Sequence, residues 1–256
     1  MEYHFENSQL LRSRGPTVRT IFSQEVESEF KRAFFGENDR GYFVEVGANQ
    51  PEELSQTFDL EQQGWTGILV EPQPDLVDKL RRRRSAKVFA ECSSRRNSGS
   101  RMKFHLAGGH SSFDPNLNLA EVKPHGVLDV PVRTLDEILV EAGASSIDFI
   151  SIDVEGHELD VLDGFDLARW RPRLILIEDL LLHLQVHRYL TRRDYRWIRR
   201  TGINNWYIPA NQLPQLGFDG RWQFFNKFYL GTPFRRLRMA WRRLTTVPDF
   251  AIPKQQ

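Results

Sequence analysis

Short apolar runs recur along the chain, and most of them end in an acidic residue. They lie near residues 42–46, 67–71, 86–90, 147–153 and 173–179. Continuous apolar runs are typical of strands buried on both faces of a sheet, and helical patterns separate these runs along the chain. This alternation predicts an α/β fold with a doubly wound, mostly parallel sheet and helices on both faces.

Helices are predicted between and before these strands. Apolar residues at helical spacing predict one ahead of the first strand, over about residues 21–34. Pro51 opens a second helix, with Leu54 on its buried side. Thr134 begins a later helix, where Glu137 completes a capping box.

The composition is that of an ordinary globular protein. The chain has 256 residues, 40% hydrophobic and 27% charged, which is enough for one sizeable domain. We divide it into a helical preamble over 1–37, a main domain over 38–230 and a basic tail over 231–256. No apolar run approaches the roughly 20 residues of a membrane-spanning helix, and the first residues lack a signal-peptide pattern. Cys92 is the single cysteine, which excludes an internal disulfide, so we expect a cytoplasmic protein.

Charge is divided unevenly along the chain. Residues 180–256 hold 14 Lys and Arg against 3 Asp and Glu, whereas the preceding residues hold 21 against 31. Such a basic end either binds an anionic partner or forms a solvated face that balances the acidic part. Arginines and aromatic residues over 188–200 predict an amphipathic helix, and a late strand is expected over 205–209. His183 and His187, one helical turn apart, either flank a substrate opening or lie on a partly exposed helix face.

The basic tail carries an apolar stripe at helical spacing, made of Phe234, Leu237, Trp241 and Leu244. Apolar residues flanked by arginines suit peripheral contact with an anionic membrane surface. The same stripe suits docking on the domain or on a second subunit of a homo-oligomer, and we place docking first. No nucleic-acid partner is expected, because no nucleic-acid-binding motif accompanies the charge.

Acidic and small residues follow the first two predicted strands. Glu45 lies at the end of the first, and Gly47 opens a turn where a ligand can approach the backbone at the carboxyl edge of the sheet. An ordinary loop opening is the alternative. Glu71 ends the second strand, where a carboxylate can accept hydrogen bonds from both hydroxyls of a ribose. Its alternative role is to face the N-terminus of the helix that begins at Pro74. The pattern predicts a nucleotide-type cofactor site.

The later strand ends carry further ionisable residues. In this architecture the loop after the third strand borders an adenine ring, so Glu91 and Cys92 are candidates there. A general base needs to reach the proton and to have a pKa near the working pH, which a histidine or a partly buried carboxylate can meet. The alternative is that the acids after the fourth strand cap the next helix. The catalytic candidates are Asp153, Glu155, His157 and Glu178.

Three segments in order, 44–49, 64–74 and 147–158, resemble the FkbM family of S-adenosylmethionine-dependent methyltransferases. The resemblance covers about residues 41–210. It implies a class I methyltransferase (Rossmann-like) fold, S-adenosylmethionine as methyl donor, and a hydroxyl oxygen of a small metabolite, sugar or natural product as acceptor. The sequence has neither the glycine fingerprint of NAD and FAD sites nor a phosphate-binding loop, which disfavours an NAD-dependent oxidoreductase.

The resemblance also implies which residues bind the cofactor. They are Glu45, Gly47, Ala48 and Asn49 on the methionine side, Glu71 at the ribose, and Glu91 and Cys92 at the adenine. Pro72 and Asp153 are further cofactor-binding candidates. One departure concerns the first motif, where Gln50 and Pro51 stand in place of a glycine that the family often has. This stiffer loop and the basic tail support the alternative of a non-catalytic binding protein of the same fold, peripheral to a membrane.

The expected chemistry is an in-line displacement at a sulfonium, so alignment of donor and acceptor supplies much of the acceleration. The acceptor hydroxyl also loses its proton, and Glu155, His157 or Glu178 would take it as a base. A divalent metal held by Asp153 and Glu178 is a second way to activate the hydroxyl, ranked below direct base catalysis.

Overall fold

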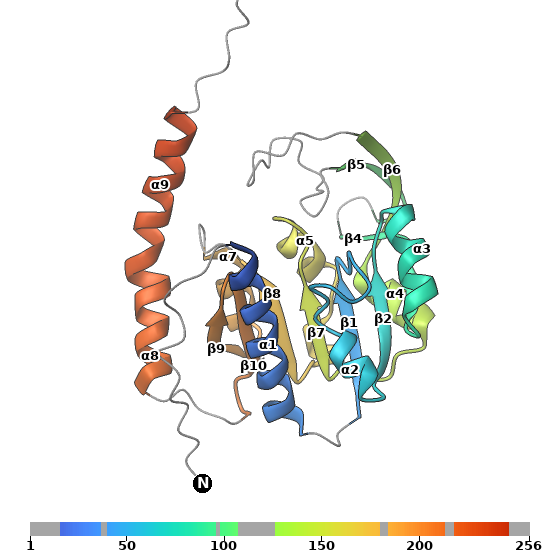
Figure 1. Cartoon of the computed structure of the whole chain (residues 1–256), viewed down its shortest axis with the longest axis horizontal. Coiled ribbons are helices and arrows are strands. Elements are labelled where there is room, and N and C mark those ends of the chain that lie inside the picture. The colour runs from blue at the N-terminus through green and yellow to red at the C-terminus, as the bar shows by residue number, and fades with distance from the viewer. Residues whose placement is uncertain are drawn as a thin grey trace, which may run out of the picture.

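A seven-stranded sheet in the order β3-β2-β1-β7-β8-β10-β9 forms the centre of the protein (Figure 1). The structure, a computed structural model, describes residues 16–36, 40–95, 98–106, 126–179, 184–212 and 218–245. The strands are β1 (Tyr42–Val46), β2 (Thr66–Val70), β3 (Lys87–Phe89), β7 (Phe149–Ile152), β8 (Leu174–Glu178), β9 (Tyr195–Thr201) and β10 (Asn204–Pro209). The pairs among β3, β2, β1, β7 and β8 are parallel, and β10 is antiparallel to both of its neighbours. The predicted mostly parallel sheet is confirmed.

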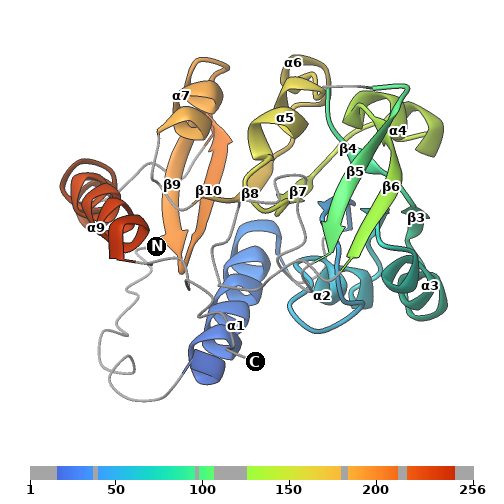
Figure 2. The same ribbon diagram turned by 90° about the horizontal axis from the view of Figure 1, so that it is seen from above.

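Helices cover both faces of this sheet, as Figure 2 shows from above. One face carries α1 (Pro16–Phe35), α2 (Phe58–Gln62) and α3 (Pro74–Arg83), and the other carries α4 (Leu135–Ala142), α5 (Glu158–Asp163), α6 (Leu167–Trp170) and α7 (Gln185–Thr191). Successive strand residues alternate between the two layers, since Phe43 packs toward α1 and α2 while Val44 packs toward α4 and α5. The sheet is therefore doubly wound.

Buried charged side chains of helix α1 contact helix α2 and the β9–β10 hairpin. Lys31 is 1% exposed, and its Nζ lies 2.7 Å from Asp59 Oδ1. Glu27, also 1% exposed, accepts hydrogen bonds from the Thr201 hydroxyl and from Asn204 Nδ2. The same helix thus contacts the start of α2 and the β9–β10 hairpin.

The predicted helix opening at Pro51 is wrong. The helix α2 begins at Phe58, and Leu54, expected on a buried side, is 51% exposed. The reason is that Glu45 accepts hydrogen bonds from the backbone and hydroxyl groups of residues 55–57, which holds them outside a helix.

The predicted amphipathic helix over 188–200 is also wrong in its second half. Helix α7 ends at Thr191, and residues from Tyr195 onward form strand β9. Tyr195 and Trp197 are both buried, which is the period of two expected for a strand. The late strand expected over 205–209 is confirmed as β10, the hairpin partner of β9.

A second, smaller sheet has the order β4-β6-β5. Its strands are β4 (Cys92–Ser93), β5 (Arg101–Leu106) and β6 (Gly126–Arg133). The capping box predicted at Thr134 and Glu137 is confirmed at the start of α4, which follows β6 directly.

The chain continues through α8 (Phe218–Phe224), the π-helical segment η1 (Phe225–Leu230) and α9 (Gly231–Thr245). Phe224 and Phe228 pack on Trp197 of β9, with ring centroids 5.3 and 5.5 Å apart. The apolar stripe of the tail, for which docking was placed first, is not buried against the domain. Phe234 is 73% and Leu237 70% exposed. Within the described residues, no helix has the length and hydropathy needed to cross a membrane.

Candidate active site

A cavity of about 550 Å³ opens at the carboxyl ends of β1, β2 and β7. Between β1 and β7 the connections change direction along the sheet, which is where open α/β sheets form ligand crevices. Every cofactor and catalytic candidate lines this cavity: Glu45, Gly47, Ala48, Asn49, Glu71, Pro72, Glu91, Cys92, Asp153, Glu155, His157 and Glu178. The fold thus brings together residues from the ends of five strands, β1, β2, β3, β7 and β8.

Of the predicted histidine pair, only His187 is among the described residues, and it does not line the cavity. His183 falls outside those residues, and His187 packs against Phe224 and Phe228 at centroid distances of 5.3 and 4.6 Å. Burial, followed by the nearby charge of Arg188, lowers the pKa of His187 to about 4. His187 is therefore a neutral side chain in the packing between α7 and η1.

The turn after β1 can only be made with glycine. Gly47 has φ +82°, and a Cβ atom there would overlap the carbonyl oxygen of Asp153. The Gly47 N–H donates to the Val70 carbonyl at 2.9 Å, which ties the turn to the end of β2. Asn49 follows with φ +51°, so the loop turns sharply twice beside the cavity.

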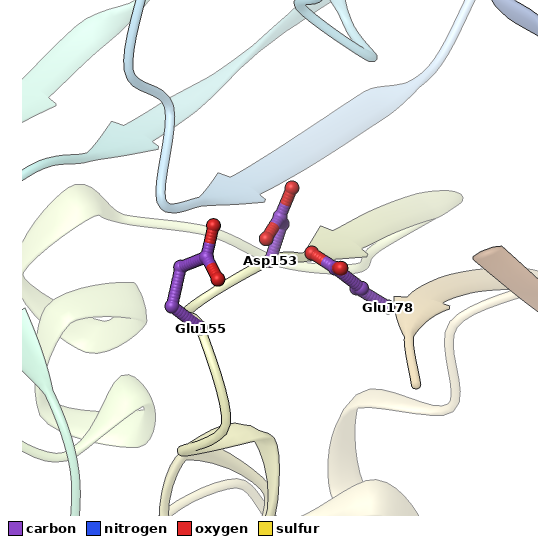
Figure 3. Close-up of side chains that lie close together, drawn as sticks. All are labelled: Asp153, Glu155 and Glu178. Carbon is purple, nitrogen blue, oxygen red and sulfur yellow. The ribbon is translucent and has the colours of Figure 1, made fainter. Parts of the chain in front are cut away.

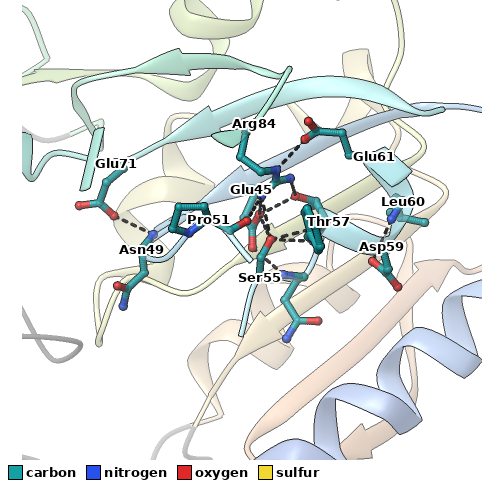
Figure 4. Close-up of polar contacts among 12 residues, drawn as sticks. Glu45, Asn49, Pro51, Ser55, Thr57, Asp59, Leu60, Glu61, Glu71 and Arg84 are labelled. Atoms are coloured by element: carbon teal, nitrogen blue, oxygen red, sulfur yellow. Dashed lines mark hydrogen bonds and ion pairs between the residues drawn. The ribbon is translucent and has the colours of Figure 1, made fainter. Parts of the chain in front are cut away.

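Glu45 is directed into the loop that follows this turn (Figure 4). Its Oε2 accepts from the hydroxyls of Ser55 at 2.9 Å and Thr57 at 2.5 Å, and its Oε1 accepts from the Gln56 N–H at 2.7 Å. Burial raises the pKa of Glu45, while Arg84 and these hydrogen bonds act in the opposite direction. Glu45 thus borders the cavity while its carboxylate oxygens hold the cavity wall.

Arg84, at the end of α3, completes this network. Its side chain is fully buried, and its Nε lies 2.7 Å from Glu61 Oε2 while Nη1 lies 3.9 Å from Glu45 Oε2. It also donates to the Pro51 carbonyl and the Thr57 hydroxyl at 2.9 and 2.8 Å. One guanidinium therefore joins the end of β1, its loop and α2, which a planar group with five donors can do.

Glu71 links the loops after β1 and β2. Its two carboxylate oxygens accept the N–H groups of Asn49 at 3.0 Å and Gln73 at 2.9 Å. Burial raises the pKa of Glu71, and hydrogen bonds from the Asn49 and Gln73 backbone and from the Gln73 side chain act against that rise. A carboxylate has about four acceptor positions, so these bonds do not use all of them. Gln73 is the N-cap of α3, so facing the helix N-terminus and facing the cavity are compatible for Glu71.

The wall formed after β3 contains two residues that the sequence analysis did not select, Ser93 and Phe104. Ser93 is 5% exposed, and its hydroxyl has no hydrogen-bond partner among the described residues. Cys92 beside it is also buried, and burial together with the charge of Glu71 raises the pKa of the thiol. Glu91 is paired with Arg133 at 3.3 Å. The position of Ser93 directly after Cys92 was the available sequence signal.

Three carboxylates gather at the other end of the cavity (Figure 3). Asp153, Glu155 and Glu178 each offer an oxygen, and these atoms lie within 4.8 Å of one another. Burial, a hydrogen bond with Asp153 and the neighbouring negative charges raise the pKa of Glu178 well above its usual range. Glu155 has φ +51°, so its backbone adopts the left-handed conformation to bring the side chain there. These surroundings favour the protonated form of Glu178.

The residues after this cluster begin helix α5. His157 is the N-cap residue, so Asp153 and Glu155 do not cap the helix as the alternative required. His157 Nδ1 lies 3.1 Å from Asp160 Oδ2. Glu158, which the sequence analysis also missed, accepts the Gly156 N–H at 2.9 Å. Burial, with the charges of Asp153 and Asp179, raises the pKa of Glu158 to about 7.

Comparison with known proteins shows the family of this chain. The family model described as the methyltransferase FkbM domain matches residues 45–197. No match was found among curated protein sequences. The structure is similar to a protein of Haemophilus influenzae described as a methylase, with 10% identity, coverage of 73% of this chain and 89% of that one, and a TM-score of 0.38.

Two methyltransferase structures from Geobacter are also similar. The precorrin-6y C5,15-methyltransferase of Geobacter metallireducens has 12% identity, coverage of 72% and 86%, and a TM-score of 0.37. A methyltransferase of Geobacter sulfurreducens has 14% identity, coverage of 78% and 90%, and a TM-score of 0.36. At these TM-scores the likenesses carry no weight beside the family match.

The strand order, the reversed strand β10 and the cavity at the sheet edge define a Rossmann-like class I methyltransferase fold. The family model matches more than half of the chain, so the chain belongs to the FkbM methyltransferase domain family. Membership of a methyltransferase family implies S-adenosylmethionine as the methyl donor.

Removing Arg84 tests the network that holds the cavity wall. Arg84→Met leaves the buried carboxylates of Glu45 and Glu61 without their cation, so we expect it to lower the free energy of unfolding by about 3 to 5 kcal/mol. Urea denaturation measures this loss. The control is Arg83→Met, because Arg83 is exposed and 3.7 Å from Glu52, and we expect less than about 1 kcal/mol there. Equal losses would contradict the assignment.

Glu158 predicts a pH dependence of stability. Its pKa of about 7 exceeds the ordinary 4.5, so the folded protein binds the extra proton. The stability contributed by the protonated form is present below about pH 4.5 and is lost as the pH rises through about 7. The loss amounts to about 3 kcal/mol. Glu158→Gln keeps an acceptor for the Gly156 N–H, so we expect its stability to exceed that of the wild type increasingly between pH 5 and 8. Thermal unfolding of both proteins across this pH range, with a chelator present, measures the difference in stability. Parallel plots of stability against pH would exclude the raised pKa of Glu158.

Proposed function

We propose that the protein transfers a methyl group from S-adenosylmethionine to a hydroxyl oxygen of a small, uncharged, hydroxyl-rich acceptor such as a sugar. The observation that carries this proposal is the division of the cavity into two ends. One end is built from the glycine turn and Glu71, and the other from the three carboxylates. A cofactor end and an acidic end within one cavity are what such a transfer requires.

The cofactor end supports adenosyl binding through residues that already have defined surroundings. The acceptor capacity left on the Glu71 carboxylate, which lines the cavity, suits a ribose hydroxyl. The neutral thiol of Cys92 and the ring of Phe104 offer an apolar surface to an adenine. The buried Ser93 hydroxyl offers a hydrogen bond to the same ring. Gly47 allows the methionine part to approach the backbone.

The acidic end supports a neutral acceptor. Carboxylate oxygens accept hydrogen bonds from hydroxyl groups, and Asp153, Glu155 and Glu178 supply several within 4.8 Å. The same negative charges repel carboxylated or phosphorylated acceptors and attract the positive sulfonium of the donor. This favours a sugar or another polyol over an acidic metabolite.

His157 is the base that we favour. It lines the cavity, and Asp160 holds its Nδ1 at 3.1 Å. In the tautomer in which Nδ1 donates to Asp160, the lone pair lies on Nε2, as in other carboxylate–histidine pairs. Glu178 is a poorer base at neutral pH because its raised pKa keeps it protonated. It would instead donate a hydrogen bond, as it does to Asp153.

A divalent cation is the alternative device for activating the hydroxyl. Three adjacent carboxylates repel one another, and either a proton or a hard cation with oxygen ligands relieves that repulsion. Asp153, Glu155 and Glu178 would be the ligands. Bound there, the cation would polarise the acceptor oxygen, and His157 would still receive the proton.

Cofactor binding is tested by calorimetric titration with S-adenosylmethionine, S-adenosylhomocysteine and NAD. We expect both adenosyl ligands to bind and NAD not to bind. Glu71→Gln replaces one acceptor oxygen by a donor, so binding should weaken about tenfold or more. The control is Asp78→Asn, an exposed carboxylate of α3, which should leave binding unchanged. Absence of heat with both adenosyl ligands would contradict the proposal.

Turnover is tested by release of S-adenosylhomocysteine with panels of neutral polyols and of acidic sugars. We expect activity with the neutral panel. His157→Gln should lower kcat by about 100-fold or more and leave the dissociation constant of S-adenosylmethionine unchanged, because the residue acts on the acceptor proton. An unchanged kcat would exclude His157 as the base. Loss of wild-type activity in EDTA, restored by Mg²⁺, would assign the carboxylates to a metal instead.

A further inference from the structure

The outer side of the C-terminal helices carries a continuous apolar stripe. Trp222, Phe225 and Tyr229 are exposed along α8 and η1. Phe234, Leu237 and Trp241 continue the series along α9, with exposed fractions of 73%, 70% and 65%. Side chains of this size rarely gather in the open on a soluble surface, so such a stripe indicates an interaction site.

The opposite side of the same helices faces the domain. Phe228 is 1% and Thr232 6% exposed, one helical turn apart, and Phe224 stacks on Phe228 at 4.5 Å. Gln223 also exchanges hydrogen bonds with the backbone of Arg200 in β9. The domain therefore fixes the rotation of the helix about its axis, and the stripe points outward as a consequence.

The π-helical segment brings the two halves of the stripe onto one side. Trp222 and Phe234 are twelve residues apart, about 3.3 turns of an α-helix, which would turn their side chains about 120° away from each other. Residues 225–230 form the π-helix, which takes more residues per turn. With the π-helical segment between them, the twelve residues from Trp222 to Phe234 span close to three whole turns. The two side chains therefore lie on the same side of the helix. π-helical segments often occur at functional sites.

Positive charge accompanies the stripe. Residues 218–245 contain seven Lys and Arg and one Asp. Arg221, Lys227, Arg236 and Arg238 are exposed. In Figure 1, α9 runs along the β9 side of the domain and extends toward the sheet edge at which the cavity opens. An occupant of this surface must match both an apolar stripe and a basic border.

We propose that α8, η1 and α9 bind an anionic membrane surface, with the helix axis in the plane of the interface. Apolar side chains then enter the boundary between headgroups and acyl chains, and the arginines and lysine meet lipid phosphates, so burial and charge attraction add. A symmetric dimer through this face would set the same basic residues against one another. Stacking on nucleic-acid bases would use the aromatic rings but would not use Leu230 and Leu237, which are also exposed.

Vesicle co-sedimentation of the full chain tests this proposal. The probes are vesicles of phosphatidylcholine mixed with phosphatidylserine and vesicles of phosphatidylcholine alone. We expect binding to the mixed vesicles that weakens with added salt, and at least tenfold weaker binding to the neutral ones. Phe234→Ser combined with Leu237→Ser should weaken binding at least tenfold. Arg236→Gln combined with Arg238→Gln should weaken binding to the mixed vesicles alone.

Matched controls exist elsewhere on the surface. Val127→Ser with Val140→Ser removes exposed apolar side chains from β6 and α4, and Arg81→Gln with Arg82→Gln removes exposed charges from α3. Both should bind vesicles as the wild type does. Because all substituted residues are exposed, circular dichroism and the thermal midpoint should be unchanged in every variant.

Four results would overturn the proposal. One is the absence of binding to mixed vesicles by the correctly folded wild type. Another is a wild-type dimer in light scattering that Phe234→Ser with Leu237→Ser converts to a monomer, because the face would then belong to a second copy. The third is tight binding of a random single-stranded oligonucleotide by a protein that ignores both kinds of vesicle. A control pair that loses binding as strongly as the stripe variants would equally contradict the assigned surface.

Discussion

The cavity depends on one buried ion pair with its surrounding hydrogen bonds, the interaction of Arg84 with Glu45 and Glu61. A carboxylate at the end of a central strand is costly to bury unless it is paired, and Arg84 supplies the positive charge from the end of α3. With that charge in place, Glu45 can hold the donors of residues 55–57, and the loop after the glycine turn takes a single course beside the cavity. The two sides of the cofactor end are thereby fixed before any ligand arrives, which lowers the ordering cost of binding.

The acidic end follows a different principle, because its charges are left close together and only partly neutralised. The pKa of Glu178 is raised, so this group keeps a proton that an exposed carboxyl group would lose at neutral pH. The pKa of the neighbouring Glu158 is raised to about 7. Groups with displaced pKa values that lie at or beside one cavity are typical of functional sites. The positive sulfonium of a methyl donor is a third means of compensating this charge, which would couple donor binding to the protonation of the cluster.

Most of the sheet could be predicted from the sequence, because buried parallel strands are continuous apolar runs that need no partner to be recognised. The site residues were found for the same reason, since they directly follow those runs. The errors have local causes. Residues 51–57 were expected to be helical, but Glu45 accepts hydrogen bonds from residues 55–57, a contact across ten positions or more that spacing does not reveal. Strand β9 was hidden because alternating Tyr195 and Trp197 are interspersed with arginines that also fit a helix. Ser93, Asp160 and Glu158 were missed because only the folded structure shows that Ser93 lines the cavity, that Asp160 contacts His157 and that Glu158 is buried beside them.

The buried contacts of Glu27 have a consequence for the order in which the chain is made. Its partners Thr201 and Asn204 lie 174 and 177 positions later in the sequence. During synthesis, α1 leaves the ribosome early and must wait for the β9–β10 hairpin before this carboxylate finds its partners. Helix α1, the first of the described helices, is therefore among the last to reach its final contacts, and until then a segment rich in phenylalanine stays accessible to chaperones.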